Sequence, residues 1–360
     1  MYTLYGAEIS YFTGKARAYL NWKQIDFTEV QATKEIYQSV ILTKVGWPVI
    51  PVLEGPGDEI LQDTSDIIDT LEARHEGVSI IPNGDFQQLA ALLFEVIGDE
   101  WLVIPAMHYR WAYNREWAHA EFGKMAAPDQ PPEEQLKIGR KNAVLFEGAL
   151  PVLGVIPEAV PAIEAAYETF LAQFSVHLEH HDFLLGARPC IGDFGLYGPL
   201  YAHLYRDPAS GEIMADKAPK VAAWVERMRD AEGAPGAFVA GDTIPETLLP
   251  MLTDQLRDFV PVLRSTADAL SNWAADKPSG EPVPRALGPH AFQINGTDSQ
   301  RMIFPFNLWM LQRPVDHYRA LSGEDRLRAD KFLENIGALS LFQDTDWPRL
   351  TRQAFKLVLA

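Results

Sequence analysis

The chain has 360 residues, 47% hydrophobic and 22% charged, which is ordinary for a globular protein and long enough for two or three domains. It carries 31 Lys and Arg residues against 49 Asp and Glu residues, a net charge of −18, so nucleic acid and anionic membrane surfaces are not expected as partners. Cys190 is the only cysteine in the sequence, which excludes an intrachain disulfide, a Cys-x-x-Cys redox pair and a cysteine-based zinc site.

The first residues, MYTLYGAEIS, contain no basic segment followed by an apolar one, as a secretory signal would. No apolar run reaches the ~18 residues expected of a membrane span. We therefore expect a cytoplasmic protein with no membrane partner.

The first 75 residues alternate between strand and helix signals. Residues 2–5 alternate in character before Gly6, and apolar residues then recur at helical spacing from Phe12 to Leu20. The remaining expected elements are a strand at 27–30, a weak helix at 33–43, a strand at 49–53, its hairpin partner at 59–62 and a helix at 64–74. The expected order is therefore βαβαββα.

Two features of residues 49–68 point to ligand binding. Pro51 lies inside an apolar strand, VIPVL, and cannot donate to a ladder, so it implies an edge, a bulge or a cis turn. The helix that follows begins at Asp63 and Thr64, whose side-chain oxygens and free backbone N–H groups suit a small zwitterionic ligand.

Three segments in this order resemble the thioredoxin-like domain of the glutathione S-transferase family. Residues 5–17, YGAEISYFTGKAR, resemble its first strand, active-site loop and opening helix. VIPVL at 49–53 resembles its cis-proline strand, and LQDTSDI at 61–67 resembles its Glu-Ser-x-Ala-Ile turn. The resemblance implies an α+β thioredoxin-like, glutathione-binding domain over 1–78 with a cis Pro51.

An all-helical domain is expected after a linker at 76–85. Apolar stripes recur at 89–118, 135–153, 161–180 and 192–205, and the resemblance implies a helical substrate domain over 86–235. FLLGARPCIGD at 183–193 resembles the family's Gly-x-x-x-Ser/Thr-x-x-Asp capping box, with Cys190 in place of the hydroxyl. Because a thiol is a weak acceptor, we expect only the Asp193 half of this box to be strong.

Residues 236–360 exceed the resemblance and read as a mostly helical C-terminal extension packed on the helical domain. We expect a helix over 245–275 and a Pro/Gly-rich connection over 278–289. A β-hairpin is expected from 290–294 and 300–304, joined through 295–298. Two or three helices close the chain, one of them starting at Ser322 in a capping-box pattern.

The resemblance implies that glutathione, as co-substrate, attacks an electrophile through its thiolate. A hydroxyl donor at a helix N-terminus would stabilise S⁻ by a charge-assisted hydrogen bond and by the helix dipole. Ser10 takes the family's Ser/Cys position, with Tyr11 and Tyr5 as rivals. The alternatives are simple N-capping by Ser10 and the absence of any side-chain donor to the thiolate. A serine here also disfavours the glutaredoxin-like branch, because reduction of a mixed disulfide needs a protein thiol.

The resemblance implies that the remaining glutathione contacts of the family fall on residues in the second half of this domain. Ile50, beside Pro51, would pair its backbone with the cysteinyl part, and Asp63 and Thr64 would hold the γ-glutamyl end, unless Asp63 is only an N-cap. The glycyl carboxylate needs a donor, and the candidates near the one-residue insertion at 46–48 are Lys34, Lys44 and Trp47.

A small hydrophobic electrophile would lie against the aromatic cluster at the start of the helical domain, unless this cluster is core. Its members are Trp101, Met107, His108, Tyr109 and Trp111. A second His-rich segment, His177 to His181, contains an i,i+4 pair but no third ligand, so we expect an exposed helix end and no metal.

The expected function is that of a glutathione S-transferase-like enzyme, a homodimer as family members usually are. One alternative is a catalytically silent glutathione-binding or protein-interaction scaffold. This scaffold alternative is favoured by departures from the family pattern at Asp63, Cys190 and 46–48, and by the long C-terminal extension. Another is a dedicated glutathione-dependent dehalogenase, etherase or isomerase.

Overall fold

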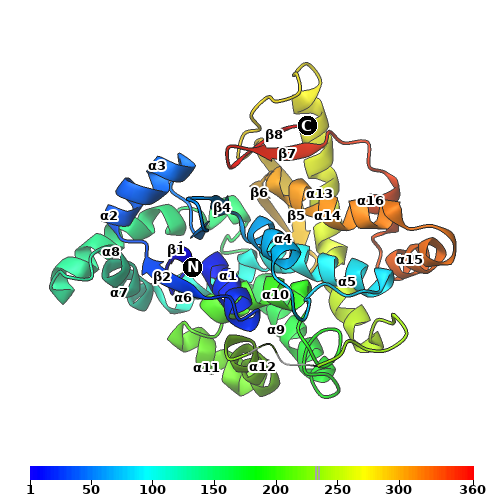
Figure 1. Cartoon of the computed structure of the whole chain (residues 1–360), viewed down its shortest axis with the longest axis horizontal. Coiled ribbons are helices and arrows are strands. Elements are labelled where there is room, and N and C mark those ends of the chain that lie inside the picture. Colours follow the sequence, from blue (N-terminus) through cyan, green and yellow to red (C-terminus); the bar gives the residue numbers. More distant parts are fainter. Residues whose placement is uncertain (232, 234–235) are drawn as a thin grey trace. The chain divides into compact units, whose positions relative to one another are not determined.

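The structure is a computed structural model that describes residues 1–231, 233 and 236–360 (Figure 1). The described residues form two compact units. The first unit comprises Met1–Ile80, Ala106–Ala149 and Phe194–Gly236, and the second comprises Ile81–Pro105, Leu150–Asp193 and Ala237–Ala360. The expected division at residues 78 and 235 uses other bounds and stays a prediction, and Pro235 itself lies outside the described residues.

A mixed sheet of four strands organises the described part of the first unit, as the expected order requires. Its strands lie in the order β2 (Phe27–Gln31), β1 (Tyr2–Gly6), β3 (Val52–Glu54) and β4 (Ile60–Gln62). β1 runs parallel to β2 and antiparallel to β3, with Leu4 opposite Leu53. Helices α1 (Tyr11–Trp22) and α4 (Thr64–Arg74) bury apolar stripes that include Leu20, Ile67 and Leu71.

The Ile50–Pro51 peptide bond is cis, which confirms the prediction. The third strand is shorter than expected, because Pro51 has no N–H to donate and the ladder begins only at Val52. The weak helix expected at 33–43 is a run of three short pieces, α2 (Lys34–Ile36), a π-helical turn (Tyr37–Ile41) and α3 (Leu42–Val45).

Helices complete the first unit. They are α6 (Val103–Tyr113), α7 (Arg115–Ala126), α8 (Pro132–Glu147), α10 (Ile191–Ala202), α11 (Pro208–Lys217) and α12 (Pro219–Arg229), of which α6 and α10 begin in the second unit. α7 and α8 approach closely because Gly139 has no side chain: a Cβ there would lie 1.8 Å from the carbonyl oxygen of His119. None of the helices in the described residues is long and apolar enough to cross a membrane.

The second unit packs around α13 (Leu249–Ala274), which lies within the helix expected at 245–275 and whose buried face includes Leu252, Leu256, Phe259 and Leu263. The other helical elements are α5 (Asp85–Val96), a π-helical turn (Ile97–Trp101), α9 (Val160–His177), α14 (Phe306–Ala320), α15 (Gly323–Asn335) and α16 (Leu339–Gln343), with short 3-10 turns at Pro151–Leu153 and Glu246–Leu248. Two antiparallel β-hairpins complete it.

The expected hairpin is present, with a tighter turn. β5 (Pro289–Ile294) and β6 (Thr297–Met302) are joined by Asn295 and Gly296 alone, which have φ angles of 47° and 76°. Positive φ at both central residues is the geometry that Asn-Gly favours in a two-residue hairpin. The second hairpin, β7 (Leu350–Gln353) and β8 (Lys356–Leu359), was not expected.

The two expected capping boxes differ in outcome. Asp193 Oδ2 accepts from the Cys190 backbone N–H at 2.9 Å and from its Sγ at 3.2 Å, so the Asp193 half is strong as predicted. Burial raises the pKa of the Cys190 thiol well above its usual range, which keeps the sulfur a donor. Ser322 is the N-cap of α15, so the expected start of this helix is confirmed, but its side chain makes no capping hydrogen bond in the described structure and the capping box is not formed.

His177 corrects a further expectation, because it is buried at the end of α9 and not exposed. Its Nδ1 lies 2.8 Å from Thr247 Oγ1 and its Nε2 lies 3.1 Å from the carbonyl oxygen of Phe183. Within the described residues, no group of three His, Cys, Asp or Glu side chains is arranged to hold a metal.

Candidate functional site

The loop between β1 and α1 places Ser10 at the N-terminus of α1. Gly6 allows this loop, because a Cβ there would lie 2.2 Å from Thr13 Cγ2. Ser10 Oγ accepts from the Thr13 N–H at 3.3 Å and so caps the helix. The first turn carries no acidic side chain among its described residues, so the positive end of the helix dipole is not neutralised locally. A capping hydroxyl still has its own hydrogen to donate.

The two tyrosine rivals are held by other contacts. Tyr5 OH donates to Glu54 Oε2 at 2.9 Å, and burial together with Glu54 raises the pKa of Tyr5 to about 12. Tyr11 is buried in the first turn of α1, where its ring meets His203 edge-on with centroids 5.6 Å apart. The structure therefore places all three hydroxyls in the first unit, with Ser10 the one at a helix N-cap.

A buried ion pair between Arg110 and Asp207 contacts the loop that carries Ser10. Arg110 of α6 donates through Nε and Nη2 to Asp207 at 2.6 and 2.8 Å. Its Nη1 donates to the carbonyl oxygen of Ile9 at 3.0 Å, one residue before Ser10. Burial raises the pKa of Asp207 above its ordinary value, although the Arg110 guanidinium opposes this shift. Sequence reasoning missed this pair, since its members are 97 residues apart.

The N-terminus of α4 carries the second group of expected contacts. Asp63 has a φ of 81° and is the N-cap, as the structural alternative proposed: its Oδ1 accepts from the N–H groups of Ser65 at 2.9 Å and Asp66 at 3.4 Å. Both bonds fall on Oδ1, which leaves Oδ2 the freer oxygen. Thr64 and Ser65 are buried beside it.

Lys15 brings a buried ammonium to the same place. Its Nζ donates to Ser65 Oγ at 3.4 Å, and the residue is fully buried. A signal for this burial exists in the sequence, because Lys15 follows Tyr11 by four residues and precedes Trp22 by seven, which places it on the buried stripe of α1.

The three candidate donors for the glycyl carboxylate differ in their surroundings. Lys44 Nζ donates to Glu54 Oε1 at 2.5 Å and holds the pKa of that carboxyl below its ordinary value. Lys34 is exposed at the start of α2, and Trp47 is half-buried after α3. Ile50, next to the cis bond, is also half-buried.

The aromatic cluster expected to line the electrophile site is divided between the units. His108, Tyr109 and Trp111 are buried in the first unit, where the ring of Tyr109 stacks on Tyr113. Trp101 is buried in the second unit, where it stacks on Phe259 with centroids 4.9 Å apart.

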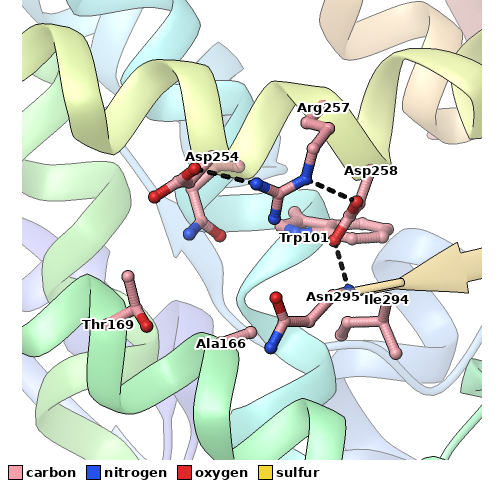
Figure 2. Close-up of a pocket in the computed structure, with 9 residues that line it drawn as sticks. Trp101, Ala166, Thr169, Asp254, Arg257, Asp258, Ile294 and Asn295 are labelled. Atoms are coloured by element: carbon pink, nitrogen blue, oxygen red, sulfur yellow. Dashed lines mark hydrogen bonds and ion pairs between the residues drawn. The ribbon is translucent and has the colours of Figure 1, made fainter. Parts of the chain in front are cut away.

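A small cavity of about 60 Å³ lies within the second unit beside Trp101 (Figure 2). Arg257 lies between Asp254 and Asp258, with nitrogen to oxygen distances of 2.9 and 3.2 Å. Asp258 also accepts from the Asn295 backbone N–H at 2.6 Å. Each of these three charged side chains therefore already has a hydrogen-bonding partner. The cavity has room for a few water molecules. The three charged residues recur on α13 at i, i+3 and i+4. This spacing places them on one face of the helix and is the sequence pattern from which the charged cluster could have been identified.

Comparisons with known proteins bear on both units. Residues 4–79 match the family model of the glutathione S-transferase N-terminal domain, and residues 157–227 match that of the C-terminal domain. No curated protein matches the chain.

Similar solved structures include a glutathione S-transferase from Rhodospirillum rubrum F11, at 18% identity and a TM-score of 0.41, covering 68% of this chain and 97% of that one. A β-etherase from Sphingobium sp. strain SYK-6 shares 19% identity, with a TM-score of 0.46 and coverage of 63% and 94%. A glutathione S-transferase from Methylobacillus flagellatus KT, solved with GSH bound, shares 15% identity, with a TM-score of 0.40 and coverage of 65% and 100%.

Proposed function

The chain belongs to the glutathione S-transferase family over residues 4–79 and 157–227, and we propose that it is a glutathione-dependent transferase in which Ser10 stabilises the glutathione thiolate. The observation that carries the proposal is the position of Ser10, the N-cap of a 12-residue helix in the same unit as the cis Pro51 and the α4 N-terminus.

The Ser10 hydroxyl would act through its hydrogen. One oxygen lone pair accepts from the Thr13 N–H, and the O–H donates to the sulfur. Together with the helix dipole, this donor favours S⁻ over SH by ~1 to 3 kcal/mol, which lowers the thiol pKa by ~1 to 2 units. The thiolate then attacks an electrophilic carbon of a small apolar molecule, so that a carbon–sulfur bond forms and the leaving group departs with its electron pair.

The α4 N-terminus would hold the other end of glutathione. Asp63 Oδ1 is occupied by two backbone N–H groups, and Oδ2 accepts from the γ-glutamyl ammonium. The backbone of Ile50 pairs with the cysteinyl part of glutathione, and Thr64 adds a hydroxyl beside Asp63. Of the three candidate donors for the glycyl carboxylate, Lys44 already donates to Glu54, and Lys34 and Trp47 remain.

A second candidate function is a glutathione-binding scaffold without catalysis. The observation that favours it is that Ser10 and Asp63 both cap helices, so the fold needs these side chains even where no reaction takes place. Lys44 is likewise already paired with Glu54, so its ammonium is less available to bind the glycyl carboxylate of glutathione.

Ser10→Gly tests the proposal, because glycine at an N-cap costs only a few tenths of a kcal/mol relative to serine while the hydroxyl is removed. The measurement is a titration of bound glutathione by thiolate absorbance, with turnover of a generic aryl halide beside it. We expect the thiol pKa to rise by ~1 to 2 units and turnover to fall about tenfold. Thr33→Ala, which removes the N-cap of α2, is the matched control and leaves both unchanged.

Three outcomes would decide the matter. If Ser10→Gly leaves the thiol pKa and turnover at the wild-type values, the hydroxyl is not the donor, and Tyr11→Phe and Tyr5→Phe become the informative variants. Retention on immobilised glutathione without turnover of any electrophile would support the scaffold. Failure to bind glutathione at all would refute both.

A further inference from the structure

Arg301 carries a buried charge in the second unit, far in sequence from the glutathione site. It lies on β6 opposite His290 of β5, on the face of the hairpin that turns inward, and is only 2% exposed. Its Nε and Nη1 atoms are buried and have no hydrogen-bond partner in the described structure. Burial lowers the pKa of Arg301 to about 10, which still leaves the guanidinium charged at neutral pH.

Aromatic rings surround this guanidinium without stacking on it. The Arg301 carbon Cζ lies 5.8 Å from the ring centroids of Trp101 and Phe292 and 5.6 Å from that of Phe304. A stacked pair in the same unit, Arg326 over Tyr318, has a separation of 3.6 Å. The rings therefore shield the Arg301 site from water but do not replace the hydrogen bonds that its N–H groups need.

The neighbours of Arg301 add further unmet hydrogen-bonding capacity. His290 Nδ1 lies 2.8 Å from Ser265 Oγ, while its Nε2 is buried and has no partner among the described residues. Burial and the charge of Arg301 lower the pKa of His290 to about 4, so the ring is neutral at pH 7. Glu100 supplies the opposing charge that acts on Arg301, but it also accepts a hydrogen bond from Asn307 Nδ2. In the part of the chain that the structure describes, Asn307 Oδ1 is buried and has no partner.

An unpaired guanidinium in such a place is costly, because a buried charge without a hydrogen-bonding counter-ion loses its hydration and gains little in return. An anion that accepts hydrogen bonds from the guanidinium would replace the lost hydration and would also supply the missing counter-ion. A planar monocarboxylate suits the site best, since a guanidinium recognises carboxylates with its fixed array of donors. The single positive charge, already partly offset by Glu100, disfavours a dianion.

We propose that Arg301, with the aromatic walls Trp101, Phe292 and Phe304, forms a binding site for a small monocarboxylate. The site lies wholly within the second unit and is independent of the thiolate chemistry proposed for the first. His290, which lies opposite Arg301, provides through Nε2 a further polar contact for a hydroxyl or water group that accompanies the ligand.

The test uses the full chain and two probes of equal shape, acetate and its neutral analogue acetamide, at an ionic strength held constant with sodium chloride. Thermal unfolding and isothermal titration calorimetry measure binding. We expect acetate to bind saturably and to raise Tm, and acetamide to do neither, because only the carboxylate pairs with the guanidinium.

Variants assign the effect to this residue. Arg301→Met removes the charge at similar length, and we expect it to weaken acetate binding at least tenfold and to leave Tm in the absence of acetate equal to or above the wild-type value. Arg301→Lys keeps the charge but loses the planar donors, and binds acetate more weakly than wild type. Arg257→Met is the matched control, because Arg257 belongs to the same unit and is already paired with Asp254 and Asp258.

Two results would overturn the proposal. One is an acetate response of the wild-type chain that equals the acetamide response, which would mean that the orphaned groups bind only water. The other is an Arg301→Met chain that binds acetate as tightly as wild type. The wild-type comparison of acetate with acetamide stands even if a variant fails to fold.

Discussion

The buried pair of Arg110 and Asp207 gives the sharpest prediction for stability. In the folded first unit, Asp207 is fully buried and Arg110 is 3% exposed. Asp207→Ala removes two charge-assisted hydrogen bonds, of 2.6 and 2.8 Å. The hydrogen bonds that the guanidinium keeps, among the described residues, are those to the carbonyl oxygens of Ile9 and Ala202. Breaking a buried pair by removing one partner costs ~3 to 5 kcal/mol, and we expect a loss of that size.

The double variant Arg110→Met/Asp207→Ala separates charge from packing. The double variant buries no unpaired charge. However, the carbonyl oxygens of Ile9 and Ala202 lose their hydrogen-bond donor, which costs ~1 to 3 kcal/mol of stability each. Arg110→Met alone leaves the Asp207 carboxylate buried without its partner and costs about as much as Asp207→Ala. We therefore expect the double variant to cost well below the sum of the two single variants, with a coupling energy of ~2 kcal/mol or more.

Urea unfolding of the four chains, followed by tryptophan fluorescence and far-ultraviolet circular dichroism, measures these differences. Glu116→Ala, which breaks the exposed pair with Arg140, is the matched control and costs ~0 to 1 kcal/mol. A loss below ~1 kcal/mol for Asp207→Ala would refute the reasoning, because it would mean that the guanidinium is not desolvated. Strict additivity of the single variants would refute it as well.

Two further predictions concern acid stability and helix capping. Burial lowers the pKa of His177 to about 4 from 6.5, so its share of stability, ~3 kcal/mol, is present above pH 6.5 and is lost as the pH falls toward 4. In pH-dependent unfolding, His177→Gln flattens this acid limb, whereas the control variant His317→Gln, at a half-buried residue, keeps it. An unchanged acid limb in His177→Gln would contradict the assignment. Asp63→Ala destabilises the chain by ~0.5 to 2 kcal/mol, whereas Asp63→Gly costs less because glycine tolerates a φ of 81°. Both variants lose glutathione affinity in calorimetry if Oδ2 binds the ammonium, and equal affinity across all three chains would exclude that role.

Local rules predicted the parts of the fold that depend on one residue type at one place. Pro51 lacks a donor and so indicated an edge, a bulge or a cis turn; the resemblance implied the cis form, and the bond is cis. Asn295-Gly296 indicated a hairpin because both residues accept positive φ, and the hairpin is there with a shorter turn. The hairpin β7–β8 was missed because its turn uses Ala354 and Phe355, at φ angles of 47° and 63°, which carry no turn signal.

Long-range contacts decided what the sequence did not predict. His177 was expected at an exposed helix end, but its burial depends on Thr247, 70 residues later. Arg301 lies on a short strand whose inward face is identified only once the hairpin register and Trp101 are in place. The candidate site follows the same rule: Ser10 and Asp63 were found from local motifs, whereas Arg110, which holds the Ser10 loop, was not.

Ser10 and Asp63 each serve the fold as well as the proposed ligand, and this explains why their presence alone does not distinguish an enzyme from a scaffold. The cap of α1 uses one lone pair of Ser10, and the cap of α4 uses Oδ1 of Asp63. Neither cap uses the Ser10 proton or Asp63 Oδ2, so these are the atoms on which glutathione chemistry depends. Glycine at either position spares most of the capping energy and removes those atoms, so a loss of thiolate stabilisation without loss of fold identifies catalysis.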